Sequence, residues 1–498
     1  MKLKPMNKAR LAQLAALGAA ALVAGCSMAP KYERPEAPIA TDWPGLRLSR
    51  SLAGTVPEAS PAVQTTAAAD IEWQSFFSDP KLRLLIEAAL RNNRDLRVAV
   101  LNIEQARAQF QIRRADQFPT VGAVATGSRQ PSTSGNGSIS STYTAGFSLT
   151  SYEIDFFGRV ASLKDAALAQ YLATEEGRKT TQISLIASVA NTYLSLLADE
   201  ELLAITQQTL ATREESFKLS QLRFDNGATS ELDLRQAESL TEAARVSLAQ
   251  LQRQRALDIN LLTLLLGQPM TGELAAALPA GQALADAPLM IDVPAGLPSD
   301  LLTKRPDIRQ AEQQLLAANA NIGAARAAFF PRISLTASAG SVSNHLSGLF
   351  ESGTFGWTLA PQLFLPLFDA GRNRAGLDSA NAGRDIAVAQ YEKAIQTAFR
   401  EVADALAGRA TLGEQLRAQQ AQASAEATRF KLSDLRYQNG IASQLDLLDA
   451  QRSLFAARQA VAQTRLLQLQ NQVTLYKTLG GGWKEPDATA AAAGTPTP

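Results

Sequence analysis

The stretch RYQNGIASQLDLLDA at residues 436–450 nearly repeats RFDNGATSELDLRQA at residues 223–237, and eight of the fifteen paired residues are identical. Each copy contains an Asn-Gly pair, at 226–227 and 439–440, which is a strong signal for a turn. A Ser-x-x-Asp sequence follows each pair and approximates a capping box, which places an acid near the start of a helix. Each copy therefore predicts a turn that leads into a helix.

The two copies belong to a tandem duplication that covers most of the chain. Val189-Ala190 against Val402-Ala403, and Leu266-Gly267 against Leu479-Gly480, keep the same shift of 213 residues. Proline is absent from 132–268 and from 367–484, and apolar residues recur at steps of three and four, as in the seam of a coiled coil. We expect the same architecture in each repeat: a helix, two strands, a long helix, a turn and a helix.

Strand signals lie between the first and second helix of each repeat. Residues 142–150, 333–339 and 357–363 alternate between apolar and polar side chains, which is the period of a strand with one apolar and one polar face. Gly/Ser-rich loops at 128–141 and 340–356 join each pair of strands. In the first repeat, the preceding helix is expected from about 79 to 117, because Pro119 disfavours helix in the residue before it.

The expected organisation follows from these signals. It comprises a signal peptide (1–25), a lipidated N-terminal linker or equatorial segment (26–78), a first repeat (79–269), an equatorial linker (270–300), a second repeat (301–483) and a disordered tail (484–498). The first repeat holds a helix, a β-hairpin at 119–157, a long helix at 160–226 and a helix at 231–266. The second holds a helix, a β-hairpin at 331–370, a long helix at 372–439 and a helix at 443–479.

The N-terminus predicts export and lipidation. Basic residues precede an apolar run at 11–24, which ends in Val-Ala-Gly-Cys at 23–26 and resembles a bacterial lipobox. Cys26 is the only cysteine, so no disulfide within the chain is possible, and we expect covalent lipid on it. Ser27 follows, where an Asp would resemble the inner-membrane retention signal. An ordinary signal peptide with a chance cysteine is the other interpretation. The expected location is the bacterial outer membrane.

Composition excludes several classes of function. Lys and Arg number 48 and Asp and Glu 47, so bulk charge indicates no nucleic-acid partner. His345 is the only histidine and lies in a hairpin loop, and no phosphate-binding or dinucleotide fingerprint follows a strand. We therefore expect no enzyme, no metal and no cofactor apart from the lipid on Cys26.

Four amphipathic strands cannot span a membrane alone, because their edge amides would be unpaired in lipid. Several copies must pool their strands, and three copies would give twelve, within the size range of outer-membrane barrels. The long helices must then project from the membrane. We expect them to enter the periplasm.

The duplicated halves resemble the TolC-type outer-membrane efflux proteins. KYERPEAP at 31–38, GLPSDLLTKRPDI at 296–308, AARAAFFPRISLTA at 324–337, VAQYEKAIQTAF at 388–399 and LYKTLGGGW at 475–483 are similar to the OprM branch of that family. The resemblance implies an α+β membrane protein: a homotrimer with a 12-stranded β-barrel continuous with a long periplasmic α-helical, coiled-coil barrel. It also implies passive export of drugs and other small molecules for a resistance-nodulation-division pump of the inner membrane, through a periplasmic adaptor (membrane fusion) protein.

The resemblance also implies a gate at the periplasmic turns. Its candidate residues are Leu445, Asp446, Asp449 and Asp233, and the candidates for a surrounding network are Arg436, Tyr437, Arg223 and Arg452. Asp233 and Asp446 could equally serve only as helix caps. Asp449 differs from these two, because its counterpart is Gln236 and the turn therefore does not require an acid there. A ring of three such acids would attract cations and repel anions.

Two other functions are compatible with the helices. One is an exit duct for type I protein secretion, and the other is a structural coiled-coil lipoprotein of the outer membrane. Heat-resistant trimers and ion conductance would distinguish a duct from the structural protein.

Overall fold

The computed structural model describes residues 28–40, 43, 68–131, 139–282, 284, 290–294 and 298–483. The predicted signal peptide, the lipidation site Cys26 and the predicted tail at 484–498 lie outside the described residues. The part of the chain that the structure describes is rich in helix and has one small sheet. It divides into two compact units, one of residues 1–36, 102–175 and 310–392, the other of residues 37–101, 176–309 and 393–498.

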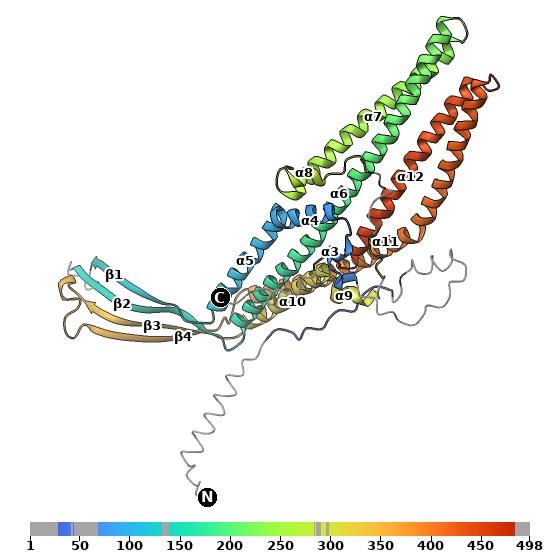
Figure 1. The fold of residues 1–498 in the computed structure, drawn as a ribbon. Coiled ribbons are helices and arrows are strands. Elements are labelled where there is room, and N and C mark those ends of the chain that lie inside the picture. Colours follow the sequence, from blue (N-terminus) through green and yellow to red (C-terminus); the bar gives the residue numbers. More distant parts are fainter. Residues whose placement is uncertain are drawn as a thin grey trace, which may run out of the picture. The chain divides into compact units, whose positions relative to one another are not determined.

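The helices and strands follow the order of two repeats (Figure 1). The first repeat contains α4 (Pro80–Asn92), α5 (Arg94–Ala115), β1 (Val121–Pro131), β2 (Ile139–Ile154), α6 (Arg159–Asp225) and α7 (Glu231–Leu266). The second contains α9 (Leu301–Lys304), α10 (Pro306–Ala327), β3 (Arg332–Ser343), β4 (Phe355–Phe364), α11 (Arg372–Gln438) and α12 (Gln444–Thr478). Short elements are η1 (Ala68–Asp70), α3 (Trp73–Phe76), α8 (Glu273–Ala277), η3 (Pro298–Asp300) and η4 (Leu346–Gly348).

The first unit contains an antiparallel sheet with the strand order β1-β2-β3-β4 (Figure 1). Its register aligns Phe147 with Ala339 and Ala339 with Trp357, so these side chains lie on one face. On the other face the hydroxyls of Ser338 and Thr358 are 2.7 Å apart. Phe147 is 65% exposed and Trp357 72% exposed. The apolar face therefore has no cover from the described residues.

The extended segment before Ala37 packs along α10 in the same unit. Arg34 donates to both carboxylate oxygens of Glu312, at 2.7 and 2.5 Å, and Asn319 donates to the Pro30 carbonyl at 2.8 Å. A Cβ on Gly323 would lie 2.8 Å from the backbone nitrogen of Ala29. Glycine at 323 therefore permits the close approach of this segment.

α6 contains an apolar stretch long enough to cross a membrane, by length and composition. However, 67% of that stretch is buried inside the chain, as in the core helix of a folded unit.

The helix expected at 79–117 is wrong in one respect, because it is broken at Asn93 into α4 and α5. Asn93 is extended, with φ −59° and ψ 134°. Its side-chain oxygen accepts from the Leu96 amide at 2.9 Å, and its side-chain nitrogen donates to the Leu265 carbonyl at 2.9 Å. The side chain thus caps α5 and binds the end of α7. We call this contact the first joint.

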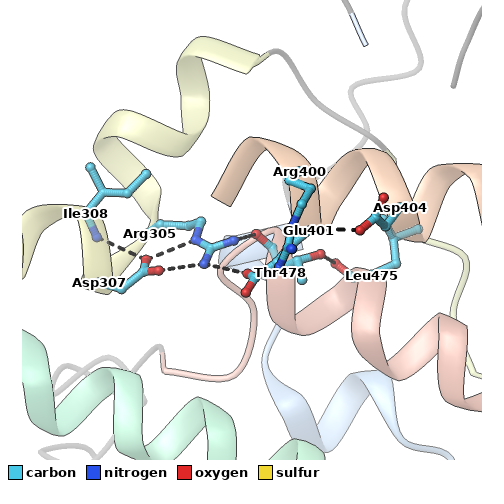
Figure 2. Close-up of polar contacts among 8 residues, drawn as sticks. All are labelled: Arg305, Asp307, Ile308, Arg400, Glu401, Asp404, Leu475 and Thr478. Atoms are coloured by element: carbon cyan, nitrogen blue, oxygen red, sulfur yellow. Dashed lines mark hydrogen bonds and ion pairs between the residues drawn. The ribbon is translucent and has the colours of Figure 1, made fainter. Parts of the chain in front are cut away.

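The second repeat has a corresponding joint, in which Arg305 separates α9 from α10 (Figure 2). Arg305 donates to the Thr478 carbonyl at 3.0 Å, and Thr478 is the counterpart of Leu265. Unlike Asn93, Arg305 also binds carboxylates: Asp307 at 2.9 and 2.5 Å and Glu401 at 2.9 Å. The side chain of Arg305 is only 9% exposed. The duplicated halves therefore share the joint, and only the second joint is ionic.

A glycine from the end of the last helix closes each joint. A Cβ on Gly267 would lie 2.3 Å from the carbonyl oxygen of Asn92, and a Cβ on Gly480 would lie 3.0 Å from that of Lys304. The close approach of these backbones explains why the Leu-Gly landmark occurs in both repeats.

Candidate functional site

The two predicted turns join α6 to α7 and α11 to α12 in the second unit (Figure 1). Gly227 and Gly440 have φ of 72° and 71°, values that glycine adopts without steric penalty. The amide of Ala228 donates to the Arg223 carbonyl at 2.7 Å, and that of Ile441 donates to the Arg436 carbonyl at 2.8 Å. These bonds satisfy carbonyls at the helix ends. The two turns therefore have the same hydrogen-bond pattern.

Asp233 and Asp446 are bound at the N-terminal ends of α7 and α12. Ser230 caps α7 and donates to Asp233 at 2.7 Å. Ser443 caps α12 in a complete capping box and donates to Asp446 at 2.8 Å. These hydroxyl bonds are the main cause that lowers the pKa of each acid. Asp446 therefore completes the cap of α12, whereas Asp233 binds the hydroxyl of the serine that caps α7. Both acids are ionised at neutral pH.

Several side-chain contacts connect the hairpins of the two repeats, among them one made by Arg223 and one made by Gln444. Arg223 at the end of α6 donates to the Tyr437 hydroxyl at 2.5 Å and lies over the Tyr437 ring at 4.9 Å. Gln444 at the start of α12 donates to the Ser220 hydroxyl at 2.7 Å. Gln444 is only 8% exposed. The pairing of Arg223 with Tyr437 within one chain places two of the predicted network residues together.

Asp449 has a cationic partner on the other helix of its own hairpin. Arg429 of α11 forms a short ion pair with it, and Arg429 also binds Glu426 at 3.2 Å. The Asp449 hydrogen bond is the main cause that raises the pKa of Arg429. Arg452, a predicted network residue, lies 3.9 Å from Asp449. The side chain of Asp449 is 45% exposed, so this pair borders water.

Leu445 and Arg436 occupy more open positions. Leu445 is 54% exposed, whereas Leu447 and Leu448 are buried. Arg436 helps to lower the pKa of Asp446 by its charge, after the Ser443 hydrogen bonds. Leu445 is therefore free to contact another molecule, and the main-chain carbonyl of Arg436 belongs to the turn.

Sequence reasoning missed Arg429 and Gln444. Arg429 lies ten residues before Asn439 and Asp449 lies ten residues after it. Residues equally distant from a turn face each other in an antiparallel hairpin, so this count would have paired them. Gln444 gave no comparable signal, because its partner Ser220 belongs to the other repeat.

The end of the helix hairpins at the two turns combines ion pairs and helix caps with an exposed leucine, Leu445. Exposed ion pairs are individually worth at most about 1 kcal/mol. The ion pairs of Asp449 lie within the α11–α12 hairpin, whereas hydrogen bonds such as Arg223 to Tyr437 and Gln444 to Ser220 join the two hairpins. Contacts of this kind can be opened by a partner that binds with moderate strength.

The profile of the family described as "Outer membrane efflux protein" matches residues 85–268 and 297–481. Two relatives from Pseudomonas putida are each 48% identical over 479 residues, with 94% of this chain and 95% of the relative covered. They are the "Antibiotic efflux pump outer membrane protein ArpC" and the "Toluene efflux pump outer membrane protein TtgC". The open state of the Neisseria gonorrhoeae MtrE outer membrane channel is similar with a TM-score of 0.81 and 41% identity, over 92% of this chain and 99% of that chain.

This chain belongs to the outer membrane efflux protein family, and the two matched segments cover most of both repeats. It is an outer-membrane channel protein of an efflux pump. The predicted resemblance is therefore confirmed.

Proposed function

We propose that three copies of this chain pool their sheets into one closed barrel of the outer membrane. The observation that carries this proposal is the exposed sheet. β1 and β4 are its two edges, and its apolar face includes Trp357 and Leu359, which are 72% and 58% exposed. Lipid would cover this face, and pairing of β1 with β4 of the next copy would satisfy the edge amides.

The helices of the three copies would form a periplasmic tunnel with the tip residues around its entrance. In that arrangement Leu445, Asp446 and Asp449 repeat three times about the axis. The contact of Arg223 with Tyr437 and that of Arg429 with Asp449 would hold the hairpins in the closed state. Contact with a periplasmic adaptor protein and a resistance-nodulation-division pump would shift the hairpins outward.

The conducted molecules would be drugs and other small molecules, including apolar solvents. Support comes from the names of the two relatives, one described for antibiotics and the other for toluene. Conduction would be passive, and the inner-membrane pump would supply the energy. Acylation of Cys26 would anchor each copy in the membrane in addition to its strands.

The test has three measurements on the full chain and on a strain that lacks it. We expect a heat-resistant trimer in detergent, ion conductance in a planar bilayer, and higher accumulation of antibiotics and toluene in the deletion strain. A Cys26→Ser variant separates anchoring from conduction, because it should still conduct. A monomer without conductance would contradict the proposal and favour a structural lipoprotein. Loss of a secreted protein with unchanged accumulation would favour a secretion duct.

A further inference from the structure

A buried acid on α6 faces a second acid on α7, away from the turns. Asp199 is only 5% exposed. The ion pair of Arg255 with Glu200 places this turn of α7 beside Asp199, and Asp258 lies close enough to act on the Asp199 carboxyl by its charge and its side chain. The Oδ2 atom of Asp199 has no hydrogen-bond partner among the described residues. Two ionised carboxylates in contact contain only acceptors, so nothing would donate between them.

The charges around the pair do not neutralise it. Arg255 of α7 is the nearby cation, but it forms a short ion pair with Glu200, the residue after Asp199. Glu200 itself adds negative charge beside Asp199. Glu201 is already bound to the backbone amide of Leu284 at 2.8 Å. The described charges of α6 and α7 thus leave Asp199 and Asp258 with a net excess of negative charge when both are ionised.

The duplication shows that the fold does not require this pair. At the shift of 213 residues, Leu412 corresponds to Asp199 and Asn471 corresponds to Asp258. Asn471 donates to the Ala405 carbonyl of α11 at 2.9 Å. The second repeat therefore joins its long helices with an apolar side chain and a neutral donor. The first repeat has two acids at the same positions, which is costly unless one of them is neutral.

We propose that Asp199 and Asp258 together bind one proton from solvent, and that this proton fastens α6 to α7. Binding converts the pair from two negative charges to one and makes a single O–H···O hydrogen bond between the helices. The pair then supplies, by protonation, the donor that Asn471 supplies permanently in the second repeat. The efflux function is not needed for this inference, because the contact lies within one chain.

The direction of the pH dependence follows from the same geometry. Burial, followed by the charge of Asp258, raises the pKa of Asp199 to about 7, whereas an exposed aspartate titrates near 3.9. Between these values the closed contact holds more protons than the open one. The equilibrium constant for opening the contact therefore rises with pH through this window, by at most about tenfold per pH unit, and it levels off above the window.

The first measurement detects the proton directly. Infrared spectra of the full chain in detergent, with the aspartate side-chain carboxyls labelled with ¹³C, should show a protonated carboxyl band at pH 6. The band should disappear in Asp199→Asn and in Asp258→Asn. It should remain in Asp404→Asn, a matched control whose side chain is 73% exposed. A wild-type spectrum without the band at pH 6 would overturn the proposal, and so would a band that survives both substitutions.

The second measurement follows the contact without relying on one variant. Hydrogen exchange of amides at 196–203 and 255–262, expressed relative to an unstructured chain, should lose protection as pH rises from 5 to 7. The double variant Asp199→Leu/Asp258→Asn copies the second repeat and should remove this pH dependence while keeping the protection. Equal pH dependence in the wild type and the double variant would overturn the proposal. If the double variant does not fold, the pH series of the wild type alone decides.

Discussion

Replacement of Arg305 tests whether the two joints are equivalent. Arg305→Ala removes a buried guanidinium that binds Asp307, Glu401 and the Thr478 carbonyl (Figure 2). Breaking a buried ion pair costs about 3–5 kcal/mol. We expect the lower end, about 3 kcal/mol, because the side chains of Asp307 and Glu401 are 32% and 35% exposed and can be hydrated. Arg305→Asn should cost only about 1.5 kcal/mol, since Asn93 makes the corresponding bond in the first joint.

Hydrogen exchange at residues 307–309 and 476–480 of the full chain measures the opening of this joint. Arg305→Ala should accelerate exchange by roughly 100-fold and Arg305→Asn by about tenfold. Exposed Arg400, whose side chain is 71% exposed, provides the control Arg400→Ala, with no change expected. Equal acceleration by the Ala and Asn variants would show that asparagine cannot form the joint at 305, and the argument from duplication would then be refuted.

Four further predictions concern the turns and the joint. Asp449→Ala and Arg429→Ala both break the ion pair of the α11–α12 hairpin, so each should change the conductance in a planar bilayer. Only Asp449→Ala should lower cation selectivity. An unchanged current in both variants would exclude the ion pair from the gate. Tyr437→Phe keeps the ring beneath Arg223 but loses the hydroxyl, and should destabilise the hairpin contact by about 1 kcal/mol. In thermal unfolding, Tyr437→Phe should lower the melting temperature less than Arg223→Ala does. Gly267→Ala forces a Cβ to 2.3 Å from a carbonyl oxygen, whereas Gly227→Ala meets open space at a similar φ. Gly227→Ala should lower the free energy of unfolding by about 1–2 kcal/mol, and Gly267→Ala should lower it clearly more. Equal melting temperatures of the two variants would contradict the close approach at Gly267. The pKa of Asp446 is lowered in the folded chain, so its capping contribution is present above the unfolded pKa near 3.9 and is lost as pH falls through the lower folded pKa. Hydrogen exchange of the amides at residues 444–447 should therefore rise in strong acid. Asp446→Asn should abolish that rise.

The order of helices and strands could be predicted from the sequence, because the residues that start and end each element lie next to the periodic pattern of that element. The helix expected at 231–266 coincides with α7, since a serine cap and a glycine end mark it on both sides. The strands have a period of two and lie between prolines and glycines. The break at Asn93 could not be predicted in this way, because asparagine is tolerated within helices and its decisive partner, Leu265, lies 172 residues away.

The same distinction applies to the candidate site. The positions of Asp233 and Asp446 beside their capping serines were predictable, because each lies three residues from its serine. The contact of Arg223 with Tyr437 was suggested only by the resemblance to a family, since it joins residues 214 positions apart. Asp199 and Asp258 gave no sequence signal at all. Each is an ordinary helical acid until packing brings α6 against α7, and only then does the comparison of repeats show them to be exceptional.

The exposed sheet has a genetic consequence. With both edges open and its apolar face uncovered, each chain must rely on its neighbours at every seam of the proposed barrel. A chain with a damaged edge strand, made in equal amount with the intact chain, would leave only about one trimer in eight free of it. Such alleles should therefore be dominant, and a proline in β1 or β4 should impair efflux even in cells that still carry the normal gene.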